Sequence, residues 1–128
     1  MNEKNGIAVD RFVRSISEER FYTAVITPLE IESAIQRRLI EHSITIKEAD
    51  IARKTATELR KRVFLVVIDY HVLDMALHLQ KIYYLRPADA MHLASARIGI
   101  DNPSKAYFLC LDKKLNAAAK LEGFNVPF

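Results

Sequence analysis

The chain has 128 residues, 50% of them hydrophobic and 27% charged, a length and composition that suit one globular domain with a real core over residues 1–128. Its single cysteine, Cys110, cannot form an internal disulfide, so we expect a reducing, cytoplasmic location. The apolar runs are far too short to cross a bilayer and no signal peptide is visible, which excludes a membrane protein. The formal net charge of +3 permits nucleic-acid binding without arguing for it.

The first third of the chain predicts a helix, a strand and a second helix. Residues 2–19 have an apolar stripe at helical spacing: Val9, Phe12, Val13 and Ile16. Residues 21–26 are rich in β-forming side chains and predict a strand. Thr27-Pro28-Leu29-Glu30 follows with a cap residue, a proline and a glutamate at the spacing of a capping box. The helix beyond it carries its inner side chains on one face: Ile31, Ala34, Ile35 and Leu39.

The middle of the chain predicts two helices around a buried strand. A helix over about 46–62 has a small apolar face (Ala52, Ala56, Leu59 and Val63) and a charged, solvated one (Lys54, Arg60, Lys61 and Arg62). The continuous apolar run 64–68 suits a strand that is buried on both faces. Asp69 should cap a helix over 70–82. That helix has two apolar stripes, so we expect it to be wedged between elements or buried in a dimer contact.

The last third predicts two further helices and two strands. A helix over 87–98 begins at Pro87, carries Asp89 in its first turn and stops at Gly99. Residues 106–111 suit another buried strand. Asp112 is placed to cap a helix over 113–121, and Gly123 ends it. Residues 124–128 read as a final edge strand, because Pro127 cannot donate to a ladder.

Strands that alternate with helices predict an α/β fold with three α/β/α layers and a mostly parallel sheet. Parallel strands end at the same sheet edge, which should bring Glu30 and Asp112 together there. If the helix that begins at Pro87 points the same way, Asp89 joins them. Three carboxylates held close need a cation, and oxygen ligands suit Mg²⁺ or Mn²⁺. Such an ion can activate water and stabilise a phosphodiester displacement.

Each of these acids also has an ordinary structural explanation. Glu30 can close a capping box, Asp112 can act as an N-cap, and Asp89 can complement a helix dipole. His92, among alanines, fits a packed and hydrogen-bonded interior residue. Cys110, inside a predicted strand, fits a small hydrophobe. Spacing alone therefore predicts an α/β domain with a possible acidic site.

Three stretches resemble the PIN domain family, the fold of the VapC-type toxin ribonucleases: 27–34, 85–94 and 108–115. The second of these, Leu85-Arg86-Pro87-Ala88-Asp89-Ala90-Met91-His92-Leu93-Ala94, is the most specific. The resemblance implies that Glu30, Asp89 and Asp112 are catalytic metal ligands. It also implies a ribonuclease that uses Mg²⁺ or Mn²⁺, acts as a homodimer and is held inactive by an antitoxin protein.

The chain departs from the family pattern at two points. Cys110 stands where the family usually has threonine or serine. The family also opens with a central strand that ends in an aspartate, and this chain begins after that strand–helix unit; Asp10 lies on a predicted helix and does not replace it. Three explanations fit: Met1 is an internal methionine, the chain is a natural remnant, or another chain completes the sheet.

Two further hypotheses accompany the ribonuclease. One is a catalytically inactive PIN-fold remnant that serves as a dimerisation or protein-binding module and has no metal affinity. The other is a purely structural α/β domain in which the three acids are caps and do not converge.

Overall fold

The computed structural model describes residues 3–15 and 20–128, with side chains from residue 7 onward. The chain forms two compact units. Residues 21–101 make up the larger unit, and residues 1–20 with 102–128 make up the smaller one. A single domain over 1–128 stays a prediction.

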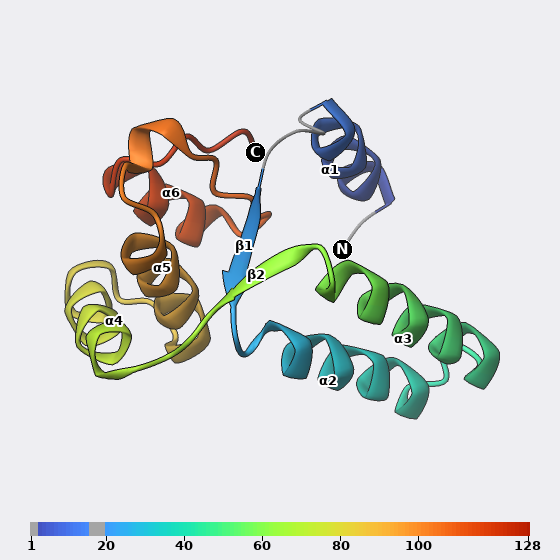
Figure 1. Cartoon of the computed structure of the whole chain (residues 1–128). Coiled ribbons are helices and arrows are strands. Elements are labelled where there is room, and N and C mark those ends of the chain that lie inside the picture. The colour runs from blue at the N-terminus through green and yellow to red at the C-terminus, as the bar shows by residue number, and fades with distance from the viewer. Residues whose placement is uncertain (1–2, 16–19) are drawn as a thin grey trace. The chain divides into compact units, whose positions relative to one another are not determined.

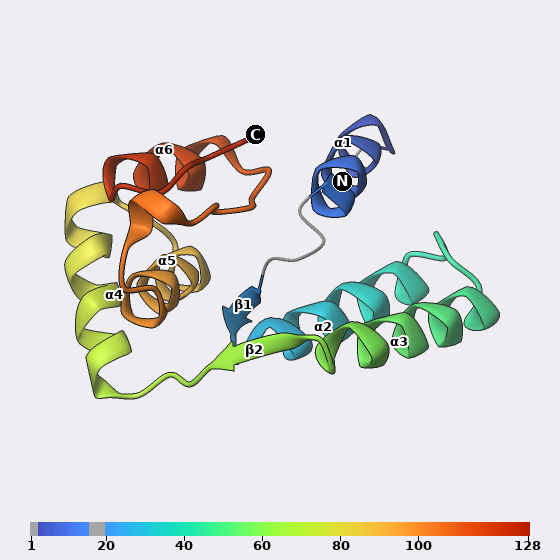
Figure 2. The same cartoon turned by 45° about the horizontal axis from the view of Figure 1, so that its top comes forward.

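The larger unit holds a pair of parallel strands and four helices. In chain order these are β1 (Phe21–Ala24), α2 (Thr27–Ile40), α3 (Ile46–Arg60), β2 (Val63–Val66), α4 (Tyr70–Tyr83) and α5 (Pro87–Gly99). β1 and β2 pair in register, with Phe21 opposite Val63 and Ala24 opposite Val66 (Figure 1). α2 and α3 run side by side as a helical hairpin (Figure 2).

Helices lie against both faces of the sheet of this unit. Side chains alternate between the two faces of a strand. On one face, Val66 lies against α5, where a Cβ added at Gly99 would come within 3.0 Å of the Val66 side chain. On the other face, Thr23, Val63 and Leu65 line a cavity together with residues of α2 and α3. The predicted α/β fold with a parallel sheet between helix layers is therefore confirmed.

The core of the unit lies where α5 packs against α4 and β1. Three consecutive residues of α5 are almost completely buried: Leu93, Ala94 and Ser95. α4 contributes Val72 and Leu79. The small side chains of α5 let neighbouring backbones come close, so this helix is the best-anchored element of the unit.

One expectation for this unit is wrong. The run 64–68 is not a strand buried on both faces: Phe64 is 54% exposed and stacks on Tyr22, with ring centroids 5.2 Å apart. Within the described residues β2 pairs with β1 alone, so it is an edge strand. For α4, only one of the two expected alternatives is excluded. It is not wedged between elements of this chain, because Leu73 is 43% and Leu77 47% exposed although Ala76 of the same stripe is buried, and burial in a dimer contact stays a prediction.

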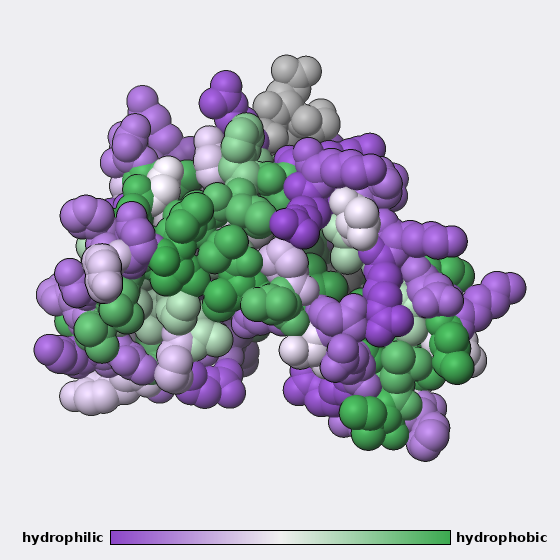
Figure 3. Space-filling view, turned by 60° about the horizontal axis from the view of Figure 1, so that its bottom comes forward, coloured by the Kyte–Doolittle hydropathy of each residue, from purple (hydrophilic) through white to green (hydrophobic). Residues whose placement is uncertain are grey.

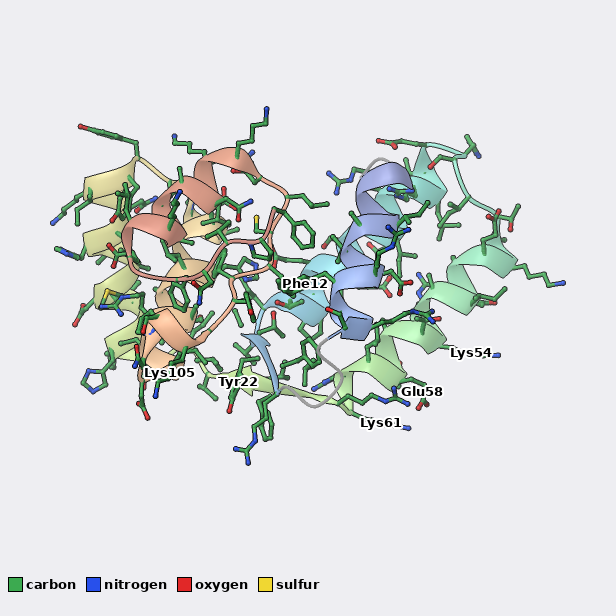
Figure 4. The ribbon with its side chains drawn as sticks, turned by 90° about the horizontal axis from the view of Figure 1, so that it is seen from above. Phe12, Tyr22, Lys54, Glu58, Lys61 and Lys105 are labelled. Atoms are coloured by element: carbon green, nitrogen blue, oxygen red, sulfur yellow. The ribbon has the colours of Figure 1, made fainter. Side chains whose placement is uncertain are left out.

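The outer face of α3 is charged and exposed, as predicted. Lys54, Glu58 and Lys61 project from it into solvent (Figure 4), and Lys61 Nζ lies 3.1 Å from Glu58 Oε1. In the space-filling view the α2–α3 hairpin is largely hydrophilic, with small hydrophobic areas between the charged groups (Figure 3). This part of the surface has the usual composition of a solvated helix face.

The smaller unit contains α1 (Glu3–Ser15), a 3₁₀ turn (Pro103–Lys105) and α6 (Lys113–Leu121). Phe12, from the apolar stripe predicted on the first helix, packs against other aromatic side chains. Its ring centroid lies 5.2 Å from that of Tyr107 and 5.6 Å from that of Phe128. Ile16, the last member of that stripe, lies outside the described residues. α6 ends at Leu121, and Gly123, two residues further on, has a φ of 101° that lets Phe124 N–H reach the Ala119 carbonyl.

The two strands predicted in the smaller unit are wrong. Residues 106–111 and 124–128 meet only in one parallel bridge between Tyr107 and Asn125. Phe108 N–H donates to Asn125 O, and Asn125 N–H donates to Ala106 O. A segment forms a β-strand only when several consecutive residues pair with a neighbouring backbone. In the described residues these two segments share a single bridge, so neither is a strand. In the described part of the chain, no helix is both long and apolar enough to span a membrane.

Candidate functional site

Glu30 lies in the first turn of α2, and the capping box predicted for it is wrong. The helix begins one residue earlier than the sequence suggests, with Ile26 as the N-cap and Thr27 already helical. Ile26 has helical backbone angles and makes no side-chain cap bond. The Thr27 hydroxyl is paired with the Thr23 hydroxyl at 2.6 Å instead. The carboxylate of Glu30 is therefore not used to close its own helix.

That carboxylate contacts His92 on α5. Because a carboxylate can only accept, His92 Nε2 donates the hydrogen bond to Glu30 Oε1. The His92 side chain is 24% exposed and that of Glu30 is 43% exposed. The hydrogen bond expected of His92 is present, but the ring is only partly buried and its partner is one of the predicted site acids. The contact joins the first turn of α2 to α5 across 62 positions of sequence.

Asp89 lies one turn before His92 on the same helix. Residues three apart on a helix are surface neighbours, with Cβ atoms roughly 5–6 Å apart. The Asp89 side chain is 23% exposed, and its Oδ2 lies 3.4 Å from Arg86 Nε. His92 therefore adjoins two of the three predicted acids, through a hydrogen bond to Glu30 and through helical spacing to Asp89.

Asp112 belongs to the smaller unit, where it is the N-cap of α6. Its Oδ1 accepts from Leu115 N–H at 2.9 Å, which confirms the predicted cap. Its own N–H donates to Cys110 Sγ at 3.2 Å, so Cys110 is a polar partner in a loop rather than a small hydrophobe inside a strand. The predicted meeting of Asp112 with Glu30 and Asp89 stays a prediction.

The oxygen donors of the larger unit suit a hard divalent ion. Among residues 3–15 and 20–128, no group of three or more His, Cys, Asp or Glu side chains is arranged to hold a metal. Mg²⁺, however, keeps several waters and is often bound by only one or two carboxylates together with substrate phosphates. The carboxylate oxygens of Glu30 and Asp89 are donors of the type that Mg²⁺ and Mn²⁺ prefer, and the metal site itself stays a prediction.

A separate cavity of about 480 Å³ lies between α2, α3 and the opposite face of the sheet. Its lining is mostly apolar, with Ile35 and Leu65 among the contributors. The Arg53 guanidinium bridges α3 to α2 at its side, donating to both carboxylate oxygens of Glu32 at 2.8 and 2.9 Å. These bonds lower the pKa of Glu32 and raise that of Arg53. The pair joins the two helices of the hairpin.

Comparison with known families gives one result. A family model described as PIN domain matches residues 2–120, which is nearly the whole chain and includes all three predicted acids. The comparison with curated proteins and the comparison with solved structures gave no match.

Proposed function

We propose that this chain, which belongs to the PIN domain family, is a divalent-metal-dependent endoribonuclease whose ion is held by Glu30 and Asp89. PIN domains are generally nucleases and typically depend on divalent metals. The observation that carries the proposal is the Glu30–His92 hydrogen bond, which brings the start of α2 to α5 one turn from Asp89. Without this hydrogen bond, Glu30 would be an exposed glutamate with no connection to α5.

The chemistry proposed for the site follows from its donor groups. Bound Mg²⁺ or Mn²⁺ would supply a polarised water and stabilise the oxygens of a phosphodiester in displacement. Glu30 and Asp89 would hold the ion through carboxylate oxygens, and Asp112 would be a third ligand, as the family resemblance implies. Arg86, beside Asp89, carries the charge that favours a phosphate group nearby.

The finer parts of the proposal concern partners and setting. The likeness of residues 85–94 to the VapC-type toxins supports a toxin of a toxin–antitoxin pair, with a cognate antitoxin as partner. The uncovered stripe of α4, with Leu73 and Leu77, supports a homodimer. A cytoplasmic location belongs to the same proposal.

The proposal is tested by incubating single-stranded RNA with the chain in Mg²⁺ or Mn²⁺, with an EDTA control. A second protein, extended at its N-terminus by the codons upstream of Met1, is assayed beside it. Metal-dependent cleavage by either protein supports the proposal. Cleavage by the extended protein alone would mean that activity needs residues upstream of Met1, and no cleavage by either protein would contradict the proposed nuclease activity.

A second candidate is a binding module without catalysis. The exposed apolar stripe of α4 favours it, because such a stripe suits a protein contact independently of any metal. This candidate predicts no Mn²⁺ affinity at Glu30 and Asp89. Tight Mn²⁺ binding that disappears in Asp89→Ala would count against it.

A further inference from the structure

We propose that His92 is a positioning residue that fixes the carboxylate of Glu30 in the orientation a divalent ion requires. The inference rests on the proposed function, since it assigns His92 a role at that metal site. His92 itself is not a ligand in this proposal, because its Nε2–H is used in the bond to Glu30 Oε1.

Glu30 needs such a partner because its own helix does not hold it. The side chain is long, 43% exposed and placed in a first turn where Ile26 makes no side-chain cap bond. An exposed glutamate loses considerable side-chain entropy when it adopts one orientation. A hydrogen bond from a fixed donor removes most of that cost before the ion arrives.

His92 is a suitable fixed donor because α5 is well anchored. The next three residues after it, Leu93, Ala94 and Ser95, are at most 1% exposed. α5 packs on both α4 and β1, so the ring projects from a rigid element. Carboxylates that bind metals are generally oriented in this way by a neighbouring donor, and loss of the donor typically costs about 10–100-fold in metal affinity or activity.

The spacing within α5 ties the two acids together. Asp89 and His92 are three residues apart, so a helix that presents His92 to Glu30 also presents Asp89 on the adjacent surface. In this arrangement α5 supplies one ligand directly and orients the other. A shift of the Glu30 carboxylate would then weaken binding without any change at Asp89.

A Mn²⁺ titration of the full chain tests the proposal with a matched pair of variants. His92→Gln places an amide N–H close to the position of Nε2, whereas His92→Asn has the same amide on a shorter side chain that does not reach Glu30. We expect His92→Asn to weaken Mn²⁺ binding by about 10–100-fold. We expect His92→Gln to stay within a few-fold of the wild type. His78→Asn, at an exposed position of α4, is the control and should bind like the wild type.

A double-mutant cycle with Glu30→Gln separates positioning from a general loss of structure. If His92 acts through Glu30, His92→Asn should weaken Mn²⁺ binding little further once Glu30 is replaced. Equal binding by His92→Asn and the wild type would overturn the positioning role and leave the proposed function intact. Additive losses, or equal weakening by His92→Gln and His92→Asn, would overturn it as well. A wild-type chain with no Mn²⁺ affinity would instead remove the proposed metal site, and this inference with it.

Discussion

The starts of α2 and α3 have the same sequence pattern and different structures. Thr27 and Glu30 open α2, and Thr45 and Glu48 open α3, each as threonine with glutamate three residues later. At α3 the pattern forms a capping box: Thr45 accepts from Glu48 N–H at 3.1 Å, and Thr45 N–H donates to the Glu48 carboxylate at 3.0 Å. At α2 neither bond forms, and Glu30 contacts His92 on another helix.

The backbone before each helix explains the difference. Thr45 has extended angles, with φ −86° and ψ 165°, which point its hydroxyl at the free N–H groups of the first turn. At α2 the residue in that position is Ile26, so the threonine has already entered the helix and its hydroxyl turns to Thr23. The comparison shows that a capping motif does not reveal whether its glutamate is structural. An isoleucine precedes both threonines, and the difference lies in the backbone at the threonine, which is extended at Thr45 and helical at Thr27.

The largest expected effect is a difference in RNA cleavage between variants of Glu30 and Glu48. Glu30→Gln should lower metal-dependent RNA cleavage by roughly 100-fold or more, since a lost ligand removes several kcal/mol of charge stabilisation. Glu48→Gln should leave the cleavage rate at the wild-type level. Initial rates at saturating Mn²⁺ measure both. Equal losses in the two variants would show that the motif, and not the contact with His92, matters.

Asp112 extends the comparison to an acid that caps its helix and is also a proposed ligand. Asparagine is as good an N-cap as aspartate, so Asp112→Asn should keep the melting temperature while cleavage falls by about 10–100-fold. Asp69→Asn, which changes the equivalent cap of α4, serves as the control. Unchanged cleavage in Asp112→Asn would show that this carboxylate is a cap alone.

The capping box at the start of α3 should contribute measurably to stability. Thr45→Ala should lower the free energy of unfolding by about 1 kcal/mol, the usual value of an N-cap side chain. Thr45→Ser keeps an oxygen at the cap and should cost much less. Urea unfolding followed by circular dichroism gives both values. A Thr45→Ala variant as stable as the wild type would mean that the capping box contributes nothing to the hairpin.

The smallest effect concerns the Glu32–Arg53 pair, which joins α2 to α3. Its hydrogen bonds to Arg53 depress the pKa of Glu32, so its contribution is present above the ordinary glutamate pKa of 4.5 and is lost as the pH falls through the lower folded value. Glu32→Gln should therefore be slightly less stable than the wild type at pH 7, and the difference should shrink at acid pH. Melting temperatures at pH 7 and pH 3 test this; a difference that grows at pH 3 would contradict it.

Local rules in the sequence predicted much of the fold. Helix starts at Pro87, after Asp69 and after Asp112 follow from side chains next to the helix itself, and the structure has all of them. The strand run 106–111 could not be judged in this way, because an apolar stretch becomes a strand only when a neighbouring backbone pairs with it. The exposure of Phe64 was missed for the same reason.

The candidate site was only partly within reach of the sequence. Glu30 and Asp89 could be selected because they begin helices and match a family pattern. The contact between Glu30 and His92 depends on how α5 lies beside the start of α2, a relation between positions 62 residues apart. The spacing of Asp89 and His92 on one helix was the available signal, and it becomes informative only once α5 is known to face Glu30.

The most direct test of the proposed metal site at Glu30 and Asp89 is to locate a bound ion by NMR. Substoichiometric Mn²⁺ added to the ¹⁵N-labelled chain broadens the amide signals nearest the paramagnetic ion. An ion held by Glu30 and Asp89 should broaden signals at the start of α2 and the first turns of α5, including Glu30, Asp89 and His92, and leave the start of α3 around Glu48 unaffected. Broadening centred on α3, or none at any Mn²⁺ concentration below that of non-specific binding, would contradict it.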